Sequence, residues 1–542
     1  MYQNREGYGG DGEMLNTPRA TRGMVSAPHH LAAQAGLAVL RDGGNAIEAA
    51  VAAAAVASVV YPHMSGLGGD GFWLIAEPGR MAVCIDASGA AGIQARPELY
   101  RDQGLNAVPR HGALAANTVA GAVSGWQAAL DISARWGGRL PLSRLFEDAI
   151  HYARGGWSVT EGQAAASRRQ LADLAGAPNF AAHFLAGSDA PSAGSRMALP
   201  ALAATLERLA AAGLDDFYRG AIGQAMAAEL QRLGSVLTSD DLARHRSVRR
   251  RPLSLALDCG VAYNLPPPTQ GLASLMVLGL FQRLKVGRAD GFEHLHGLVE
   301  ATKRAFIVRD AHVTDPAYMA VHATTYLSDG VLDRLAARID PRRALAWPEG
   351  TDDGDTVWLG VVDGQGRAVS YIQSLAQAFG SGVMLADTGI LWHNRGHAFT
   401  LDESGLHLLK PRRKPFHTLN PALVQLKDGR LMVYGCMGGH GQPQTQAAVF
   451  TRYALYGQDL QAAVTAPRWA LGRDWAAPSS DLKIEEGFPD EVVAALRKAG
   501  HEVRMVPRFD SLMGHAGAVV RRPDGLLEGA ADPRGDGVVA AF

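Results

Sequence analysis

A run of small apolar residues from Ala46 to Val60 places the strongest constraint on how this chain can fold. Nearly every residue of the run is alanine or valine, so a helix formed by it would have no polar face. Asn45 can cap the first turn, Glu48 stands where it completes a capping box, and Pro62 lies past the end. The sequence therefore predicts a buried helix with close packing on both sides.

The periodicity of the chain changes after Thr356. Helical patterns dominate before it, for example in 124–137, 140–156 and 291–311. Apolar, β-branched segments joined by Gly-containing turns predict strands within 356–363, 366–375, 421–435 and 517–532. Helical patterns return at 444–457 and 490–500. A helix-rich front and a strand-dominated back favour layered packing with antiparallel sheets.

Composition excludes several classes of protein. The chain has 542 residues with 47% hydrophobic and 19% charged content, which is typical of a globular protein with a large core. A net charge of −1 gives no global attraction to nucleic acid or to an anionic membrane surface. The basic run from Arg244 to Pro252 is interpreted as a solvated connector, with contact to a partner or substrate as the alternative.

The cysteines and the N-terminal sequence indicate in which cellular compartment the protein is expected. Cys84, Cys259 and Cys436 are odd in number and widely spaced, which argues against a disulfide framework and against a CxxC metal site. No basic segment followed by an apolar stretch opens the chain, and Ala46–Val60 is too short to span a bilayer. We expect a cytoplasmic protein that binds neither membrane nor nucleic acid.

Two patterns resemble cofactor or metal motifs but lack the context of one. Gly66, Gly68 and Gly71 fit G-x-G-x-x-G, yet a helix precedes them and a strand-like segment follows, the reverse of a dinucleotide site. Tight turns and close backbone approach explain these glycines better. His294 and His296 are two residues apart, so on a helix they point in different directions. We therefore predict no cofactor and no metal.

Thr356 opens its predicted strand directly after a polar, Gly-containing acidic run, Gly350 to Asp355. Such a run is expected to be exposed and cleavable. The segment 435–442, "GCMGGHGQ", follows another strand and offers adjacent backbone N–H groups. Together they suggest an acyl-transfer site in which Thr356 becomes a new N-terminus, its α-amine acting as base for its own hydroxyl. As an ordinary strand residue, Thr356 would need no such explanation.

Seven motifs, in matching order, carry a family resemblance over nearly the whole chain. They are residues 43–74, "LPPPTQGLAS" at 265–274, 355–383, "TGILWHN" at 388–394, "KPFHTLNPALV" at 414–424, "YGCMGGHGQ" at 434–442 and "GAADPR" at 529–534. In these motifs the chain resembles the γ-glutamyltransferase (glutathione hydrolase) family of N-terminal nucleophile hydrolases. The resemblance implies an α+β fold, a four-layer αββα sandwich. It also implies a precursor that cleaves itself between Asp355 and Thr356 into fragments 1–355 and 356–542, which remain associated as one catalytic domain.

The catalytic positions of the family are all occupied here. By resemblance, Thr356 is the nucleophile, and Ser374 is the hydroxyl that hydrogen-bonds it. Gly438 and Gly439 are the oxyanion-hole pair, whose donors are each worth roughly 3 kcal/mol.

The substrate pocket departs from the family pattern. The glutamate-binding Arg of the family aligns with Ser88, and its acidic residue for the substrate ammonium aligns with Ala398. An Asn aligns with Ala376, and a Gln with Arg395. A Ser-Ser pair is replaced by His417 and Thr418.

Without these charged partners, a γ-glutamyl group should bind poorly. Arg395 and His417, as cationic or donor groups, suit a small anionic amide. A surface arginine and a satisfied loop histidine are the alternative interpretations of these two residues.

These features resemble the oxamate amidohydrolase branch, so the expected function is hydrolysis of a small anionic amide such as oxamate through an acyl-enzyme. One alternative is a glutathione hydrolase or γ-glutamyl transpeptidase with a rearranged pocket. Another is a protein that only binds an anionic metabolite. The expected assembly is a heterodimer of the two fragments, with further dimerisation left open.

Overall fold

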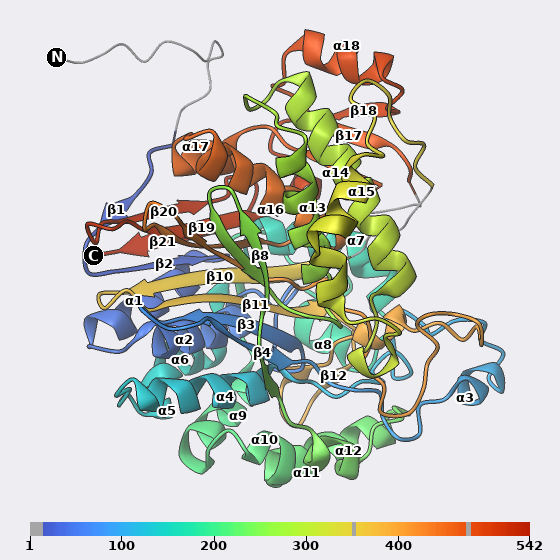
Figure 1. Cartoon of the computed structure of the whole chain (residues 1–542). Helices are drawn as coiled ribbons and strands as arrows, with labels where there is room; N and C mark the ends of the chain where they lie inside the picture. The colour runs from blue at the N-terminus through green and yellow to red at the C-terminus, as the bar shows by residue number, and fades with distance from the viewer. Residues whose placement is uncertain (1–14, 349–353, 473–478) are drawn as a thin grey trace.

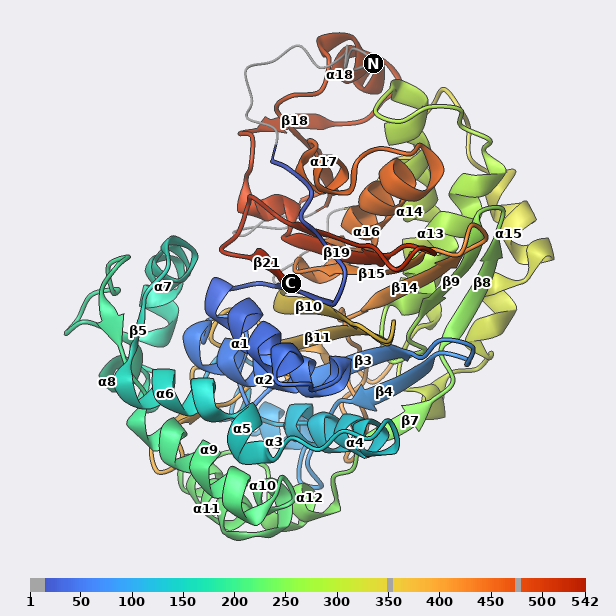
Figure 2. The same cartoon turned by 90° about the vertical axis from the view of Figure 1, so that its left-hand side faces the viewer.

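The computed structural model describes residues 15–348, 354–472 and 479–542. Two antiparallel sheets of seven strands face each other, and helices cover the outer face of each sheet (Figures 1 and 2). This arrangement is the expected four-layer αββα sandwich, an α+β fold. The chain passes several times from one sheet to the other.

Both sheets combine strands from before and after Thr356. Sheet A has, in spatial order, β1 (Arg19–Ala20), β20 (Leu527–Ala531), β19 (Ala516–Arg521), β15 (Leu431–Cys436), β14 (Ala422–Leu426), β9 (Gly260–Asn264) and β8 (Leu253–Leu257). Sheet B has β21 (Val538–Ala541), β2 (Gly23–Ala27), β10 (Asp355–Asp363), β11 (Ala368–Ala376), β3 (Asp70–Ala76), β4 (Val83–Ala87) and β7 (Val248–Arg250). The four predicted strand regions after Thr356 are therefore confirmed.

The outer layers are helical. Sheet B is covered by α1 (His30–Arg41), α2 (Ala46–Val60) and α4 (Ala122–Arg135), while α5 (Leu142–Leu145) and α6 (Glu147–Gly155) pack against α2. Sheet A is covered by α13 (Gly271–Arg283), α16 (Gln442–Phe450) and α17 (Leu460–Thr465), while α14 (Phe292–His312) packs against α13 and α16.

The described residues form further helices and short strands. The helices are α3 (Pro97–Arg101), α7 (Glu161–Leu174), α8 (Phe180–Phe184), α9 (Pro200–Ala212), α10 (Asp216–Arg219), α11 (Ala221–Arg232), α12 (Ser239–Arg244), α15 (Asp329–Ala336) and α18 (Asp490–Lys498). The short strands are β5 (Trp157–Ser158), β6 (Arg196–Met197), β12 (Met384–Leu385), β13 (Ile390–Leu391), β16 (Trp469–Leu471), β17 (Leu482–Glu485) and β18 (Val503–Val506).

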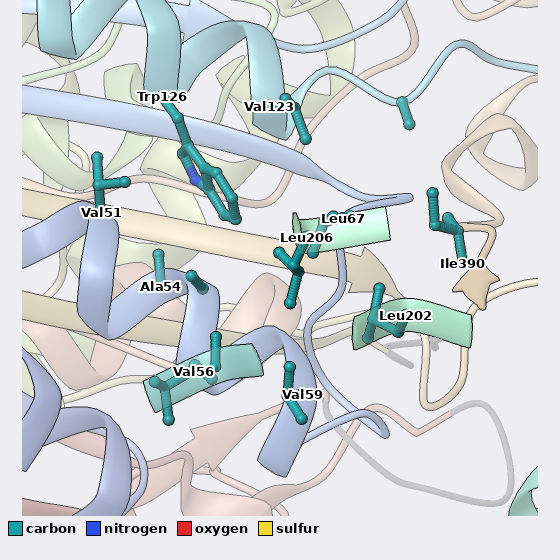
Figure 3. Close-up of a cluster of buried hydrophobic side chains, with 14 of the residues drawn as sticks. Val51, Ala54, Val56, Val59, Leu67, Val123, Trp126, Leu202, Leu206 and Ile390 are labelled. Atoms are coloured by element: carbon teal, nitrogen blue, oxygen red, sulfur yellow. The ribbon is translucent and has the colours of Figure 1, made fainter. Parts of the chain in front are cut away.

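Helix α2 is buried along its whole length, as its sequence predicts. The Asn45 side chain accepts hydrogen bonds from the first-turn amides, and the Glu48 carboxylate accepts one from the Asn45 amide at 2.8 Å, which completes the capping box. Val51, Ala54, Val56 and Val59 of this helix lie among side chains from other elements, including Trp126 and Leu206 (Figure 3). The small residues let neighbouring layers approach closely on both sides.

Trp358 of β10 fixes how the two sheets face each other. Its indole is buried between them, together with residues such as Phe72 and Val433. A Cβ atom on Gly435 or Gly517 of sheet A would lie only 2.2 or 2.4 Å from this ring. The glycines therefore make room for the indole, and the fit places β10 firmly against sheet A two residues after Thr356.

The remaining sequence predictions can be checked in the same structure. Strand β3 follows the G-x-G-x-x-G segment, and a Cβ on Gly68 would lie 2.2 Å from the Leu391 carbonyl oxygen, so close backbone approach is confirmed. None of the three cysteines forms a disulfide. Within the basic run, Val248–Arg250 form edge strand β7 beside β4. Within the described ranges, every helix is too short or too polar to cross a bilayer.

Candidate active site

Thr356 lies at the start of β10, and Ser374 lies near the end of β11, the neighbouring antiparallel strand. Both side chains are buried, and the pairing of the strands shifts register between Asp355 and Val357. The Ser374 hydroxyl donates a hydrogen bond to the Asp355 carbonyl oxygen and lies 3.4 Å from Thr356 Oγ1. It also accepts a hydrogen bond from the Ala376 amide at 2.8 Å. One hydroxyl thus touches both the Thr356 side chain and the carbonyl of the peptide bond before it.

The residues just before Thr356 differ from the sequence expectation. Strand β10 begins at Asp355, and Gly354 and Asp355 are buried, so the expectation of an exposed run is wrong for these two residues. The physical reason is that Asp355 pairs with Ala376 across the sheet. Gly350, Asp352 and Asp353 lie outside the described residues.

Gly438 and Gly439 form the turn between β15 and α16. Their φ angles are 138° and 50°, in the left-handed region that favours glycine. A Cβ on Gly354 would lie 2.6 Å from Gly439 Cα and 3.3 Å from its amide nitrogen. The chain leading to Thr356 therefore passes directly against this turn.

His417 and Thr418 lie in the loop before β14, close to the same point. The His417 amide donates to the Pro268 carbonyl at 2.9 Å, and the imidazole Nε2 lies 3.2 Å from Asp70 Oδ2. Thr418 Oγ1 lies 3.6 Å from the position a Gly354 Cβ would take. Thr418 is thus beside the chain that approaches Thr356.

His417 is a neutral group near pH 7. Burial lowers its pKa to about 4, although nearby Asp70 opposes that shift. The expected cationic role of His417 is therefore corrected, because desolvation of the charged imidazole outweighs the carboxylate beside it. What remains is a polar, uncharged hydrogen-bonding side chain.

Asp70 is a site residue that the sequence analysis missed. Its Oδ1 accepts hydrogen bonds from the Gly89 and Gly121 amides at 3.1 and 3.0 Å, while Oδ2 faces His417. Burial alone would raise its pKa, but His393 and His417 lower it to about 2. The buried Asp70 carboxylate therefore connects Gly89, which follows β4, with His417 in the loop before β14.

Ser88 lies just after β4, but its hydroxyl is already engaged. It donates to Asp86 Oδ1 at 2.6 Å, and Lys414 Nζ lies 3.2 Å from Ser88 Oγ and 2.9 Å from Asp86 Oδ2. Burial would raise the pKa of Asp86, but Lys414 and Ser88 lower it. The positive charge next to Ser88 therefore comes from Lys414, the first residue of the motif at 414–424, to which the sequence analysis gave no role.

Arg395 begins the short 3-10 helix Arg395–Ala398 and is buried, with 5% of its surface exposed. Burial is the main cause that lowers the pKa of His417, and the positive charge of Arg395 lowers it further. Arg395 therefore lies close to His417. This location excludes the alternative of a surface arginine. Ala376, with φ of 81°, and Ala398 carry no polar side chain at their positions.

Thr356 also borders a cavity of ≈ 20 Å³, which it shares with Trp358, Met437 and His515 among others. A space of this size holds about one water molecule.

Elsewhere in the described residues, His296, Glu300 and His501 place donor atoms within 4.8 Å of one another. His296 Nδ1 lies 2.8 Å from His501 Nε2, and Lys303 Nζ donates to Glu300 at 2.7 Å. The two histidines therefore pair with each other, while Glu300 is paired with Lys303 and accepts a hydrogen bond from the Leu345 amide at 3.1 Å.

The family model "Gamma-glutamyltranspeptidase" matches residues 32–542. The chain belongs to the γ-glutamyltranspeptidase family. Its relatives carry the names of amide-bond hydrolases, and this protein is an enzyme of that class.

Three relatives show the range of the γ-glutamyltranspeptidase family around this chain. An oxamate amidohydrolase proenzyme of Klebsiella pneumoniae is 53% identical over 96% of this chain and 99% of its own length. A glutathione hydrolase-like proenzyme of Bacillus subtilis is 40% identical over 96% of this chain and 99% of its own length. The crystal structure of cephalosporin acylase from Bacillus halodurans superposes with a TM-score of 0.89 at 32% identity, covering 100% of this chain and 99% of that one. The predicted family and fold are confirmed.

Proposed function

We propose that this protein is a self-processing amidohydrolase whose nucleophile is Thr356 and whose substrate is a small anionic amide such as oxamate. The observation that carries the proposal is the contact of one hydroxyl, that of Ser374, with both Thr356 Oγ1 and the Asp355 carbonyl oxygen. Such an arrangement polarises the carbonyl next to the hydroxyl that would attack it.

The first reaction is cleavage of the chain itself. Thr356 Oγ attacks the Asp355 carbonyl carbon, the C–N bond breaks, and the hydroxyl proton passes to the nitrogen. Water then adds to the resulting ester, releasing the Asp355 carboxylate and restoring the Thr356 hydroxyl. The products are fragments 1–355 and 356–542. Both sheets contain strands from each fragment, so separation would break paired strands within both sheets, and the fragments stay together as a heterodimer.

The second reaction is turnover of substrate. The freed α-amine of Thr356 takes the proton of its own hydroxyl, because the ordinary pKa of an α-amine, about 8, leaves part of it unprotonated near neutral pH. The hydroxyl attacks the substrate amide while the Gly438 and Gly439 amides stabilise the oxyanion. Ammonia leaves with that proton, and water hydrolyses the acyl-enzyme.

The side chains at the positions that align with the family's substrate-binding residues support an anionic substrate. Arg395 supplies a buried positive charge that can pair with a carboxylate, and neutral His417 and Thr418 supply hydrogen bonds. Ala398 offers no carboxylate for a substrate ammonium. The 53% identity to an oxamate amidohydrolase proenzyme agrees with this choice.

A second candidate is hydrolysis of γ-glutamyl amides, which the 40% identity to a glutathione hydrolase-like proenzyme favours. Ammonia release from oxamate, compared with amine release from a γ-glutamyl anilide, separates the two. A cleaved protein that turns over neither compound would instead be a binder of an anionic metabolite.

Self-cleavage is tested by intact mass and denaturing gel on wild type, Thr356→Ala and Thr356→Ser. We expect two fragments with Thr356 as the new N-terminus in wild type, one full-length chain in Thr356→Ala, and slower cleavage in Thr356→Ser. An active wild-type enzyme that remains one unbroken chain would refute the mechanism.

A further inference from the structure

Gln270 lies between the two loops that bracket the approach to Thr356. It immediately precedes α13 and is fully buried. Its side-chain nitrogen donates to the Thr418 carbonyl at 2.7 Å and to the Gly439 carbonyl at 2.8 Å. Its backbone amide donates to the His417 carbonyl at 2.9 Å. A single residue therefore connects the loop of His417 and Thr418 with the turn of Gly439.

Arg309 of α14 decides which way the Gln270 amide points. Arg309 Nη1 donates to Gln270 Oε1 at 2.9 Å. A guanidinium has donors only, so the atom facing it must be the oxygen, and the NH₂ group must face the two carbonyls. Arg309 is itself held, because its guanidinium lies 3.7 Å from the Phe306 ring centroid and its Nε donates to Asp310 at 2.7 Å.

Gln270 is the link nearest to Thr418 and Gly439 themselves; just beyond it, the Asn420 amide donates to Gln442 Oε1 at 3.2 Å. Gly438 and Gly439 have no side chains, and Gly439 adopts a left-handed φ of 50°. Both NH₂ hydrogens of Gln270 are used, one for each loop, so one rigid planar group spans the gap between the Thr418 and Gly439 carbonyls. Displacement of a reacting group by about 1 Å can reduce a rate about 100-fold.

We propose that Gln270, oriented by Arg309, is a positioning residue that holds the oxyanion-hole turn at the correct distance from the substrate loop. The inference rests on the proposed function of Thr356, Gly438 and Gly439. Gln270 acts through the two loops and has no direct part in bond making.

The test is steady-state kinetics of oxamate hydrolysis on fully cleaved Gln270→Met. Methionine has nearly the same length but cannot donate. We expect kcat to fall about 10- to 100-fold, with a smaller change in KM. The matched control is Gln163→Met, since Gln163 is equally buried and accepts a hydrogen bond from Trp157 Nε1 at 3.2 Å. It should lose comparable thermal stability while keeping its kcat.

Arg309→Met tests the orienting role. It should reduce kcat in the same direction, and the double variant with Gln270→Met should be no slower than the worse single variant, because both break one arrangement. Independent, multiplying losses would overturn the role of Arg309. If Gln270→Met does not fold, Gln270→Glu carries the test: it keeps the shape but turns an oxygen towards two carbonyls, and it should lose kcat as well.

The outcomes separate this inference from the proposed function. Normal kcat in cleaved Gln270→Met, together with an inactive Thr356→Ala, overturns the positioning role alone. An equal loss of kcat in Gln163→Met also overturns it, because the effect would then be one of stability. Cleavage or turnover by Thr356→Ala overturns the proposed function, whatever Gln270 does.

Discussion

Replacing Ser374 by alanine should slow self-cleavage about 100- to 1,000-fold. The Ser374 hydroxyl is a hydrogen-bond donor to the Asp355 carbonyl, where negative charge develops during attack by Thr356. Loss of one such donor costs about 3–4 kcal/mol of transition-state stabilisation. The contact with Thr356 Oγ1 is long at 3.4 Å, so we assign most of the effect to the carbonyl contact.

The assay is a time course of freshly synthesised protein in a cell-free system, with cleavage followed by denaturing gel and the products identified by intact mass. Ser370→Ala is the matched control on the same strand. It removes the acceptor of the Trp358 Nε1 hydrogen bond at 2.9 Å but leaves Asp355 untouched. It should lose stability, as Ser374→Ala does, yet cleave at a normal rate. Ser374→Thr keeps the hydroxyl and should recover most of the rate. A wild-type half-life for Ser374→Ala would refute the assigned role.

Three further changes test other parts of the structure. Gly354→Ala should slow self-cleavage at least tenfold, because its Cβ would lie 2.6 Å from Gly439 Cα; Gly287→Ala, where nothing lies within 4 Å, should cleave normally, and equal rates for both would contradict the tight packing. Because the folded-state pKa of His417 is lowered to about 4, folding stability contributed by the neutral imidazole is complete above pH 6.5 and is lost as the pH falls towards 4. At pH 5 wild type should have lost about 2 kcal/mol more than His417→Gln in urea unfolding, and parallel pH profiles would show that the imidazole is not desolvated. Asn45→Ala should lower the melting temperature by removing the cap of α2, at a cost of about 1–2 kcal/mol, and an unchanged melting curve would mean that the capping box contributes nothing.

Several features were determined by the sequence itself, because they depend on neighbours along the chain. The burial of α2 follows from its continuous small apolar residues, and the capping box follows from the spacing of Asn45 and Glu48. The strands after Thr356 follow from β-branched residues and Gly-containing turns. Thr356 was suggested by the acidic run before its strand together with segment 435–442, whereas the four-layer fold and the role of Ser374 came from the family resemblance of ordered motifs.

Only the tertiary structure decided what surrounds each of these groups. The burial of Gly354 and Asp355 depends on pairing with Ala376 and on contact with Gly439. The neutral state of His417 depends on desolvation in a site that also contains Asp70. The engagement of Ser88 with Asp86 and Lys414, and the link from Arg309 through Gln270 to two loops, join residues from distant parts of the chain. Charge state and hydrogen bonding are set by three-dimensional neighbours and by exclusion of water, which only the folded chain brings together.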